Sequence, residues 1–202
     1  MAVNEKVKVI GLTGMSGAGK STACNAFASE GFAVVDCDRI CRDIVEKGKP
    51  CLHEIAEVFG SSVLNKDGSL DRAETGRVIF SDEGKRKLLG GIMYPYVSYI
   101  VIRIIIGMDK GFAVLDAPTL FESGIDSICD SIVSIVAEKG VLLRRIENRD
   151  HISREQAENR LASQHDIRYF SERSDHLIEN NGSSDEFLSE IMKTIKKLKE
   201  GK

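Results

Sequence analysis

The sequence predicts an α/β fold in which helices flank a mostly parallel, five-stranded sheet. Strand-like apolar runs alternate along the chain with segments of helical periodicity, and a glycine-rich loop follows the first run. Such alternation is typical of a parallel sheet with helices on both faces. The predicted strands are residues 7–12, 33–36, 112–116, 131–136 and 176–178.

The loop after the first predicted strand has the phosphate-binding pattern G-x-x-x-x-G-K-S and leads into a helical run at residues 23–28. Backbone N–H groups of such a loop surround a phosphate chain, and the following helix adds its positive N-terminal end. Lys20 supplies a cation for the outer phosphates, and the Ser21 hydroxyl is the expected Mg²⁺ ligand. The predicted nucleotide-binding residues of the loop are Gly14, Ser16, Gly17, Ala18, Gly19, Lys20, Ser21 and Thr22.

Composition favours a cytoplasmic enzyme, and we expect a monomer or a weak homo-oligomer. The 202 residues carry a net charge of −3 with acids and bases interspersed, so we expect no nucleic-acid partner. No positive start with an apolar stretch marks secretion, and five cysteines without C-x-x-C spacing indicate reduced thiols. The most apolar stretch, residues 97–106, is too short to span a bilayer and contains Arg103. We therefore expect it to be buried core, with no membrane partner.

Residues 49–107 interrupt the strand–helix alternation and predict a helical insertion. Helical spacing, a turn at residues 65–68 and a helix start at Asp71 mark this region. The turn reads N-K-D-G, which lacks the N-K-x-D spacing of a guanine-binding motif, so a GTPase is disfavoured. We expect one domain over residues 1–202, whose parts are a core (1–48, 108–138, 166–202), the insertion (49–107) and a lid (139–165).

Two acids, Asp36 and Asp38, follow the second predicted strand. Ligands of open α/β sheets bind outside the carboxyl ends of the strands, so we expect at least one of these carboxylates to face the phosphates. A carboxylate there can accept a proton from an attacking hydroxyl or hold a Mg²⁺-bound water. Both acids lie on one side if the strand continues to residue 38. The alternative is that both cap a helix that starts near Arg39.

Two helices joined by a short turn are predicted after the fourth strand, as in the lid of small kinases. Residues 142–150 are helical, and S-R-E-Q at 153–156 is a capping box that begins the second helix. Arg145 and Arg149 are four residues apart and share one helix face, which Arg160 is positioned to meet. Guanidinium groups brought in by lid closure would neutralise charge on a transferring phosphoryl group. The alternative is that these are solvent-exposed helix arginines.

Over nearly its whole length the chain resembles the dephospho-coenzyme A kinase family. The resemblance depends on I-G-L-T-G at 10–14, V-V-D-C-D at 34–38, L-D-R at 70–72, L-D-A-P-T-L-F-E at 115–122, R-L-A-S-Q at 160–164 and S-D-H-L-I-E-N at 174–180. It implies a P-loop nucleotide-kinase-like fold and ATP-dependent phosphorylation of the ribose 3′-hydroxyl of dephospho-coenzyme A, the last step of coenzyme A synthesis. The implied partners are ATP, dephospho-coenzyme A and Mg²⁺.

The resemblance also assigns roles to residues. It implies that Asp38 is the catalytic base and Arg145 the lid arginine, acting with Lys20, while Arg149 and Asn180 contact ATP. Mg²⁺ would bind Ser21, with Asp38 or Asp116 through water. The acceptor residues would be Asp36, Arg42, Arg72, Tyr94, Pro118, Leu120 and Glu122.

The chain departs from the family pattern at four positions, and none of these replacements removes a phosphate-handling group. Met15 replaces a glycine, Asp71 an asparagine, Tyr94 a histidine and Thr119 a leucine. Two other functions remain open at this point. One is a kinase of this shape for another nucleotide-like or sugar hydroxyl, and the other is a nucleotide-binding regulator without turnover.

Overall fold

The computed structural model describes residues 7–80 and 82–201. Packing divides the chain into two compact units, and each is described by itself. The first combines the part of the chain up to Val35 with the part from Asp109 onward, and the second is Asp36–Met108. Residues 36–48 therefore group with the helices of the predicted insertion, because the helix that follows residue 36 packs on the long helix of that unit.

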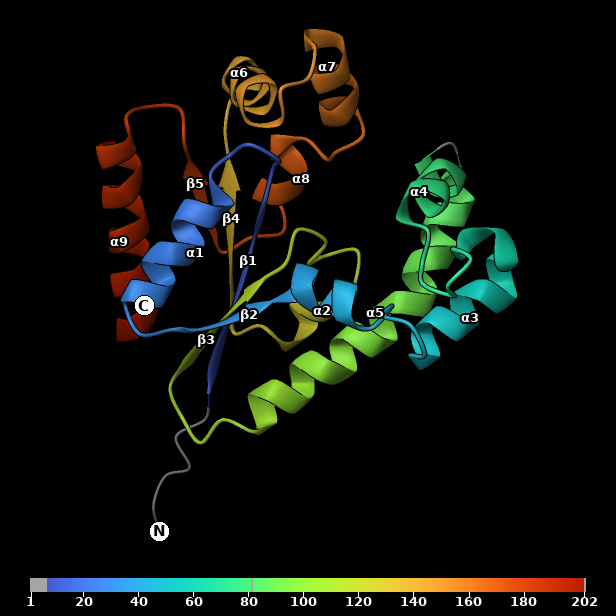
Figure 1. Ribbon diagram of the computed structural model, residues 1–202. Coiled ribbons are helices and arrows are strands. Elements are labelled where there is room, and N and C mark those ends of the chain that lie inside the picture. The colour runs from blue at the N-terminus through green and yellow to red at the C-terminus, as the bar shows by residue number, and fades with distance from the viewer. Residues whose placement is uncertain (1–6, 81, 202) are drawn as a thin grey trace. The chain divides into compact units, whose positions relative to one another are not determined.

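The sheet has five strands in the order β2-β3-β1-β4-β5, with β1 at its centre (Figure 1). β1 pairs in parallel with β3 and with β4, and β4 pairs in parallel with β5. The strands are β1 (Lys8–Gly14), β2 (Ala33–Asp36), β3 (Phe112–Asp116), β4 (Ser131–Val136) and β5 (His176–Glu179). The predicted fold class is confirmed, and three of the five strands have the predicted bounds.

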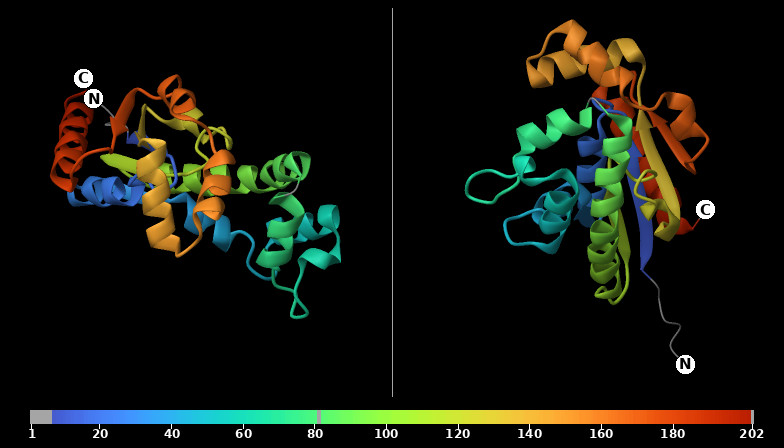
Figure 2. Two further views of the ribbon diagram at one scale, coloured as in Figure 1. Left: turned by 90° about the horizontal axis from the view of Figure 1, so that it is seen from above. Right: turned by 90° about the vertical axis from the view of Figure 1, so that its right-hand side faces the viewer.

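The helices of the first unit follow the predicted alternation. They are α1 (Lys20–Ser29), α6 (Lys139–Asp150), α7 (Arg154–Ala162), α8 (Ile167–Ser171) and α9 (Ser184–Glu200), with a 3₁₀ turn at Ile125–Ile128. The predicted capping box is confirmed, since Ser153 and Gln156 exchange side-chain and backbone hydrogen bonds at the start of α7. α6 follows β4 directly, so α6 and α7 lie beyond the carboxyl end of that strand (Figures 1 and 2).

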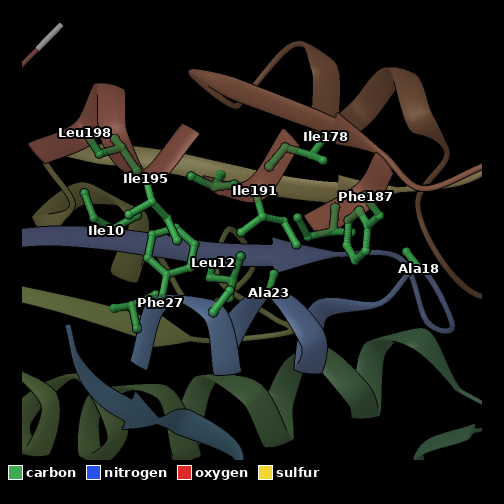
Figure 3. Close-up of a cluster of buried hydrophobic side chains, with 14 of the residues drawn as sticks. Ile10, Leu12, Ala18, Ala23, Phe27, Ile178, Phe187, Ile191, Ile195 and Leu198 are labelled. Atoms are coloured by element: carbon green, nitrogen blue, oxygen red, sulfur yellow. The ribbon is translucent and has the colours of Figure 1, made fainter. Parts of the chain in front are cut away.

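One face of the sheet is covered by α1 and α9, which lie side by side (Figure 3). Leu12 of β1, Phe27 of α1 and Ile191 of α9 are fully buried in this cluster. Full burial of such a side chain contributes roughly 1.5–3 kcal/mol. On the other face, Leu120 packs over Gly11, where a Cβ atom would lie 2.7 Å from Leu120 Cδ2. The core thus fixes β1, from whose carboxyl end the phosphate loop extends.

The second unit is helical, as the sequence predicts. It consists of α2 (Cys37–Asp43), α3 (Pro50–Phe59), a 3₁₀ turn (Ser61–Val63), α4 (Arg72–Phe80) and α5 (Glu83–Ile106). The turn at residues 65–68 closes with the Gly68 N–H donating to the Asn65 carbonyl at 2.9 Å. Asp71 caps α4 by accepting from the Glu74 N–H at 2.8 Å. The predicted turn and helix start are both confirmed.

The expectation that residues 97–106 form buried core is wrong for much of the stretch. These residues end the 24-residue helix α5, in which Val97 and Val101 are buried, while Ile102 is 40% and Ile106 75% exposed. Helical periodicity is the reason, since Val97 and Val101 are four positions apart and share the buried face of the helix, while Ile102 and Ile106 lie on exposed faces. By length and composition this one helix is apolar enough to cross a membrane, which is weak evidence for a span.

Candidate active site

The phosphate loop is held against β4 by its first residues. Gly14 has φ +142°, and a Cβ atom there would lie 2.1 Å from the Ile135 carbonyl oxygen, so only glycine fits. The Met15 N–H donates to the same carbonyl at 3.0 Å, and the Ala18 N–H donates to the Met15 carbonyl at 3.0 Å. The loop therefore has a defined curvature before it enters α1 at Lys20.

Lys20 forms an ion pair with Asp116, the last residue of β3. The two side chains are about one-fifth exposed, and β3 lies next to β1 in the sheet. Parallel neighbouring strands end at the same edge, so the carboxylate after β3 meets the cation that begins α1. The two predicted residues are thus brought together, although no local pattern predicts a direct pair between them.

Arg145 of α6 contacts Asn180, the residue after β5. Its Nη1 donates to the Asn180 carbonyl at 3.0 Å and its Nη2 to Asn180 Oδ1 at 3.2 Å. Asn180 Nδ2 in turn donates to the Ala18 carbonyl at 2.7 Å. Arg145 and Asn180, two predicted site residues 35 positions apart, therefore meet at the phosphate loop.

Arg149 and Arg160 both pair with Asp150, at the end of α6. Arg149 makes two hydrogen bonds of 2.8 Å to the two oxygens of that carboxylate, and Arg160 reaches one of them from α7. Hydrogen bonding by Arg149 is the main cause that lowers the pKa of Asp150 to about 2. The sequence predicts that Arg160 faces Arg145 and Arg149. It does not predict that Arg149 and Arg160 share Asp150.

Gln164, which follows α7, contacts the phosphate loop. Its Oε1 accepts from the Ser16 N–H at 2.9 Å, while its Nε2 donates to the Arg160 carbonyl at 3.2 Å. This residue stands in the R-L-A-S-Q motif, but its spacing alone gave it no role. A lid segment is thus tied to the loop by a side chain that local sequence reasoning did not single out.

The predicted acceptor residues after β3 have different surroundings. The Pro118 carbonyl accepts from Thr13 Oγ1 at 3.3 Å, and Glu122 pairs with His165 Nε2 at 3.2 Å. The His165 ring stacks on Tyr169 with centroids 3.6 Å apart. Leu120 is fully buried, so its side chain belongs to the core and is not exposed to an acceptor.

In the second unit, Asp36 is the N-cap of α2 and accepts from the Arg39 N–H at 2.8 Å. Arg42 Nη2 lies 4.0 Å from Asp36 Oδ2. The strand ends at Asp36, so the expected strand alternation does not reach Asp38, which lies in the first turn of the helix. The two acids therefore have different positions, and of the two it is Asp36 that is the cap.

The remaining predicted acceptor residues lie on helices of the second unit. Arg72 is the first residue of α4 and is exposed. The Tyr94 ring of α5 lies close over Gly90, where a Cβ atom would come within 2.7 Å of the ring. Because Gly90 has no side chain, the Tyr94 ring can occupy the space beside it.

Within residues 7–80 and 82–201, no group of three or more His, Cys, Asp or Glu side chains is arranged to hold a metal ion. Ser21 and Asp116 supply oxygen donors at the loop, which is the donor type that Mg²⁺ prefers. Mg²⁺ is usually held by one or two protein groups together with substrate phosphates. The donor set at the loop fits that mode of binding.

These features define a P-loop phosphotransferase of the small-kinase type. They are a parallel sheet with a phosphate loop after its central strand, a lysine–aspartate pair at that loop, and a helical lid that carries arginines. The fold is shared with shikimate kinase from Acinetobacter baumannii, at 18% identity and a TM-score of 0.52 over 98% of this chain and 96% of that one.

Sequence comparison narrows the class to one family. Residues 8–186 match the family model described as dephospho-CoA kinase. The chain is 36% identical to dephospho-CoA kinase of Bacillus licheniformis over 87% of this chain and 89% of that one. It is 29% identical to the solved dephospho-CoA kinase of Campylobacter jejuni, with a TM-score of 0.68 over 96% and 98% of the two chains. The chain belongs to the dephospho-CoA kinase family, as the resemblance predicts.

Proposed function

We propose that this protein transfers the γ-phosphoryl group of ATP to the ribose 3′-hydroxyl of dephospho-coenzyme A. The observation that carries the proposal is the family match over residues 8–186 in a chain whose phosphate loop is complete. A lysine and a carboxylate meet at that loop. A small kinase needs these groups to bind and activate a nucleoside triphosphate.

The loop and Lys20 hold the phosphates in this proposal. At the start of α1 the N–H groups of Thr22 and Ala23 donate to the Gly19 carbonyl, so those of Lys20 and Ser21 are the helix N–H groups proposed to bind phosphate oxygens. Lys20 leaves Asp116 for the outer phosphates when ATP binds. Ser21 would then hold Mg²⁺, with Asp116 or Asp38 through water, and the ion would supply positive charge to the outer phosphates.

Asp38 is the proposed base that orients and deprotonates the ribose hydroxyl. It is exposed in the first turn of α2, directly after β2, in the part of an α/β sheet where ligands bind. Asp36 supports that helix turn as its cap. In-line transfer then depends on positioning more than on covalent chemistry, since the loop fixes the donor and Asp38 the acceptor.

Arginines of the lid complete the proposed site. Arg145 contacts Asn180, which contacts the loop at Ala18, and these contacts support the proposal that its guanidinium meets the nucleotide as the lid closes. Arg149 contacts ATP once it leaves Asp150. The family resemblance assigns acceptor binding to Arg42, Arg72 and Tyr94 of the second unit and to Pro118 and Glu122 of the first.

An acceptor panel tests the proposal against a kinase for another hydroxyl. ADP formation is measured by a coupled assay with ATP, Mg²⁺ and one of dephospho-coenzyme A, adenosine, shikimate or gluconate. We expect rapid ADP formation with dephospho-coenzyme A alone. Faster turnover of another acceptor would overturn the substrate assignment, and no turnover with any of them would favour a nucleotide-binding regulator.

A further inference from the structure

We infer that Asn180 is a positioning residue that fixes the direction of one N–H group of the phosphate loop and holds the Arg145 guanidinium beside it. This inference rests on the nucleotide site proposed above. It assigns Asn180 a role through the loop, whereas the family resemblance implies a contact with ATP itself.

Asn180 is 6% exposed, and each of its polar groups has a partner. Its backbone N–H donates to the Val136 carbonyl at 2.8 Å, which fixes the residue at the end of β5 beside β4. Its Nδ2 donates to the Ala18 carbonyl at 2.7 Å, and its Oδ1 accepts from Arg145 at 3.2 Å. The two contacts agree on the orientation of the amide, because a flipped amide would oppose donor to donor and acceptor to acceptor.

The contact with Ala18 controls the next peptide N–H. In a planar trans peptide the C=O of one residue and the N–H of the following residue point in opposite directions. Because Asn180 draws the Ala18 carbonyl toward β5, the Gly19 N–H points away from β5. A phosphate loop works by presenting such N–H groups to the phosphate chain. The Asn180 amide therefore sets the orientation of a group that binds substrate, without touching substrate.

The close approach of the loop to Asn180 explains the glycine at position 19. Gly19 has φ +104°, and a Cβ atom there would lie 2.6 Å from Asn180 Nδ2 and 3.0 Å from the Phe187 ring. Figure 3 shows Ala18 just beyond the end of β1, near Phe187 of α9. The loop can pack this tightly only where a side chain is missing, so Gly19 and Asn180 fit each other.

The neighbouring residue contacts the lid. Asn181 Oδ1 accepts from the Glu138 N–H, at the N-cap of α6, at 2.7 Å. Arg145, on the same helix, reaches back to both oxygens of Asn180. Asn180 and Asn181 therefore join the loop to the first helix of the lid. Among the described contacts of these two residues, only those of Asn180 reach the loop.

Asn180→Asp separates the two contacts of Asn180. Aspartate keeps an acceptor for Arg145 but has no donor for the Ala18 carbonyl, and it places oxygen against oxygen. We expect binding of inorganic pyrophosphate, measured by calorimetry, to weaken roughly tenfold or more, and the KM for ATP to rise by a similar factor. Asn159→Asp, on the exposed face of α7, adds the same charge and is the matched control.

Two outcomes would contradict these proposals, and they are distinguishable. If the wild-type protein does not bind pyrophosphate, the proposed nucleotide site itself fails. If the wild type binds it and a folded Asn180→Asp binds it equally well, the positioning role is overturned. A purely structural residue would lower the melting temperature while leaving the affinity for pyrophosphate and the KM for ATP in place.

Asn180→Ala provides the same test without a buried charge, should the aspartate variant not fold. If neither variant folds, hydrogen exchange of the wild-type side-chain amides decides. We expect the Asn180 amide protons to exchange much more slowly than those of the exposed Asn181. Equally fast exchange would overturn the inference, because the bond to Ala18 would then be absent in solution.

Discussion

Asp36 and Asp38 are two residues apart, yet they have different physical roles at the start of α2. Asp36 caps the helix through the Arg39 N–H, while Asp38 lies in the first turn and is exposed. Asparagine caps a helix as well as aspartate does. A change of charge at position 36 therefore preserves the helix, and a change at position 38 removes the proposed base.

We predict that Asp38→Asn lowers kcat at least about a hundredfold, the lower range for loss of a positioned general base, while ATP binding persists. Asp36→Asn, the matched control, lowers kcat much less. Steady-state kinetics with saturating ATP measure both values. If the larger loss occurs in Asp36→Asn, the base must be reassigned to that residue.

The sequence predicts the loop residues of the site better than it predicts their partners. The motif at residues 14–22 is local, so spacing alone identifies it. Lys20 and Asp116 are 96 positions apart, and Asn180 and Ala18 are 162 positions apart. Their contacts arise from the order of strands in the sheet, which local patterns do not determine. The pairing of Arg149 with the neighbouring Asp150 was missed because both residues have other possible partners on a helix surface.

At the scale of the element, the connection from α7 to the loop depends on Gln164. We predict that Gln164→Ala lowers kcat/KM for ATP on the order of 2- to 10-fold, the usual worth of one neutral hydrogen bond. Gln164→Glu keeps the oxygen that accepts from Ser16 and recovers part of the loss. An unchanged kcat/KM in Gln164→Ala would show that the contact plays no part in nucleotide binding.

Asp150 of α6 accepts a hydrogen bond from Arg160 of α7 and so connects the two lid helices. Its lowered pKa predicts how the stability of the fold depends on pH. A carboxyl whose folded-state pKa is lowered from 3.8 to about 2 stabilises the fold fully above pH 4, and this contribution disappears as the pH falls through 2. We predict that the Tm difference between wild type and Asp150→Asn is constant from pH 7 to about pH 5 and shrinks below about pH 4.

The carbon NMR signal of the Asp150 carboxyl checks the same prediction directly. Its titration should have a midpoint near 2. A midpoint near the ordinary 3.8 would mean that Arg149 and Arg160 do not hold this carboxylate in solution.

Helices and strands could be predicted where the sequence pattern that defines them lies within a few neighbouring residues. Strands and caps follow from alternation and turn chemistry, and the start of α7 at its capping box was correct to the residue. The burial of α5 was not predictable from hydrophobicity, since an apolar helix buries only the face that has neighbours. Val101 faces them and Ile106 does not.

At the scale of the whole molecule, the packing of α1 and α9 on β1 holds the strand that carries the loop. We predict that Ile191→Ala, at a fully buried position, lowers the free energy of unfolding by about 2–5 kcal/mol. Met192→Ala, one position along and 40% exposed, changes it by no more than about 0.5 kcal/mol. Urea unfolding measures both. Equal losses would mean that α9 does not pack as described.

In the proposed reaction, the phosphate loop holds ATP while its γ-phosphoryl group is transferred to the 3′-hydroxyl of dephospho-coenzyme A. The most direct test follows oxygen-18-labelled γ-phosphate by mass spectrometry and phosphorus NMR of the acceptor. We predict that the label appears at the 3′ position with the wild type and with Lys193→Ala, a lysine on the exposed face of α9. With Lys20→Ala the rate falls at least about a hundredfold. The proposed reaction is contradicted if the label is found only in free phosphate, or if Lys20→Ala transfers it at the wild-type rate.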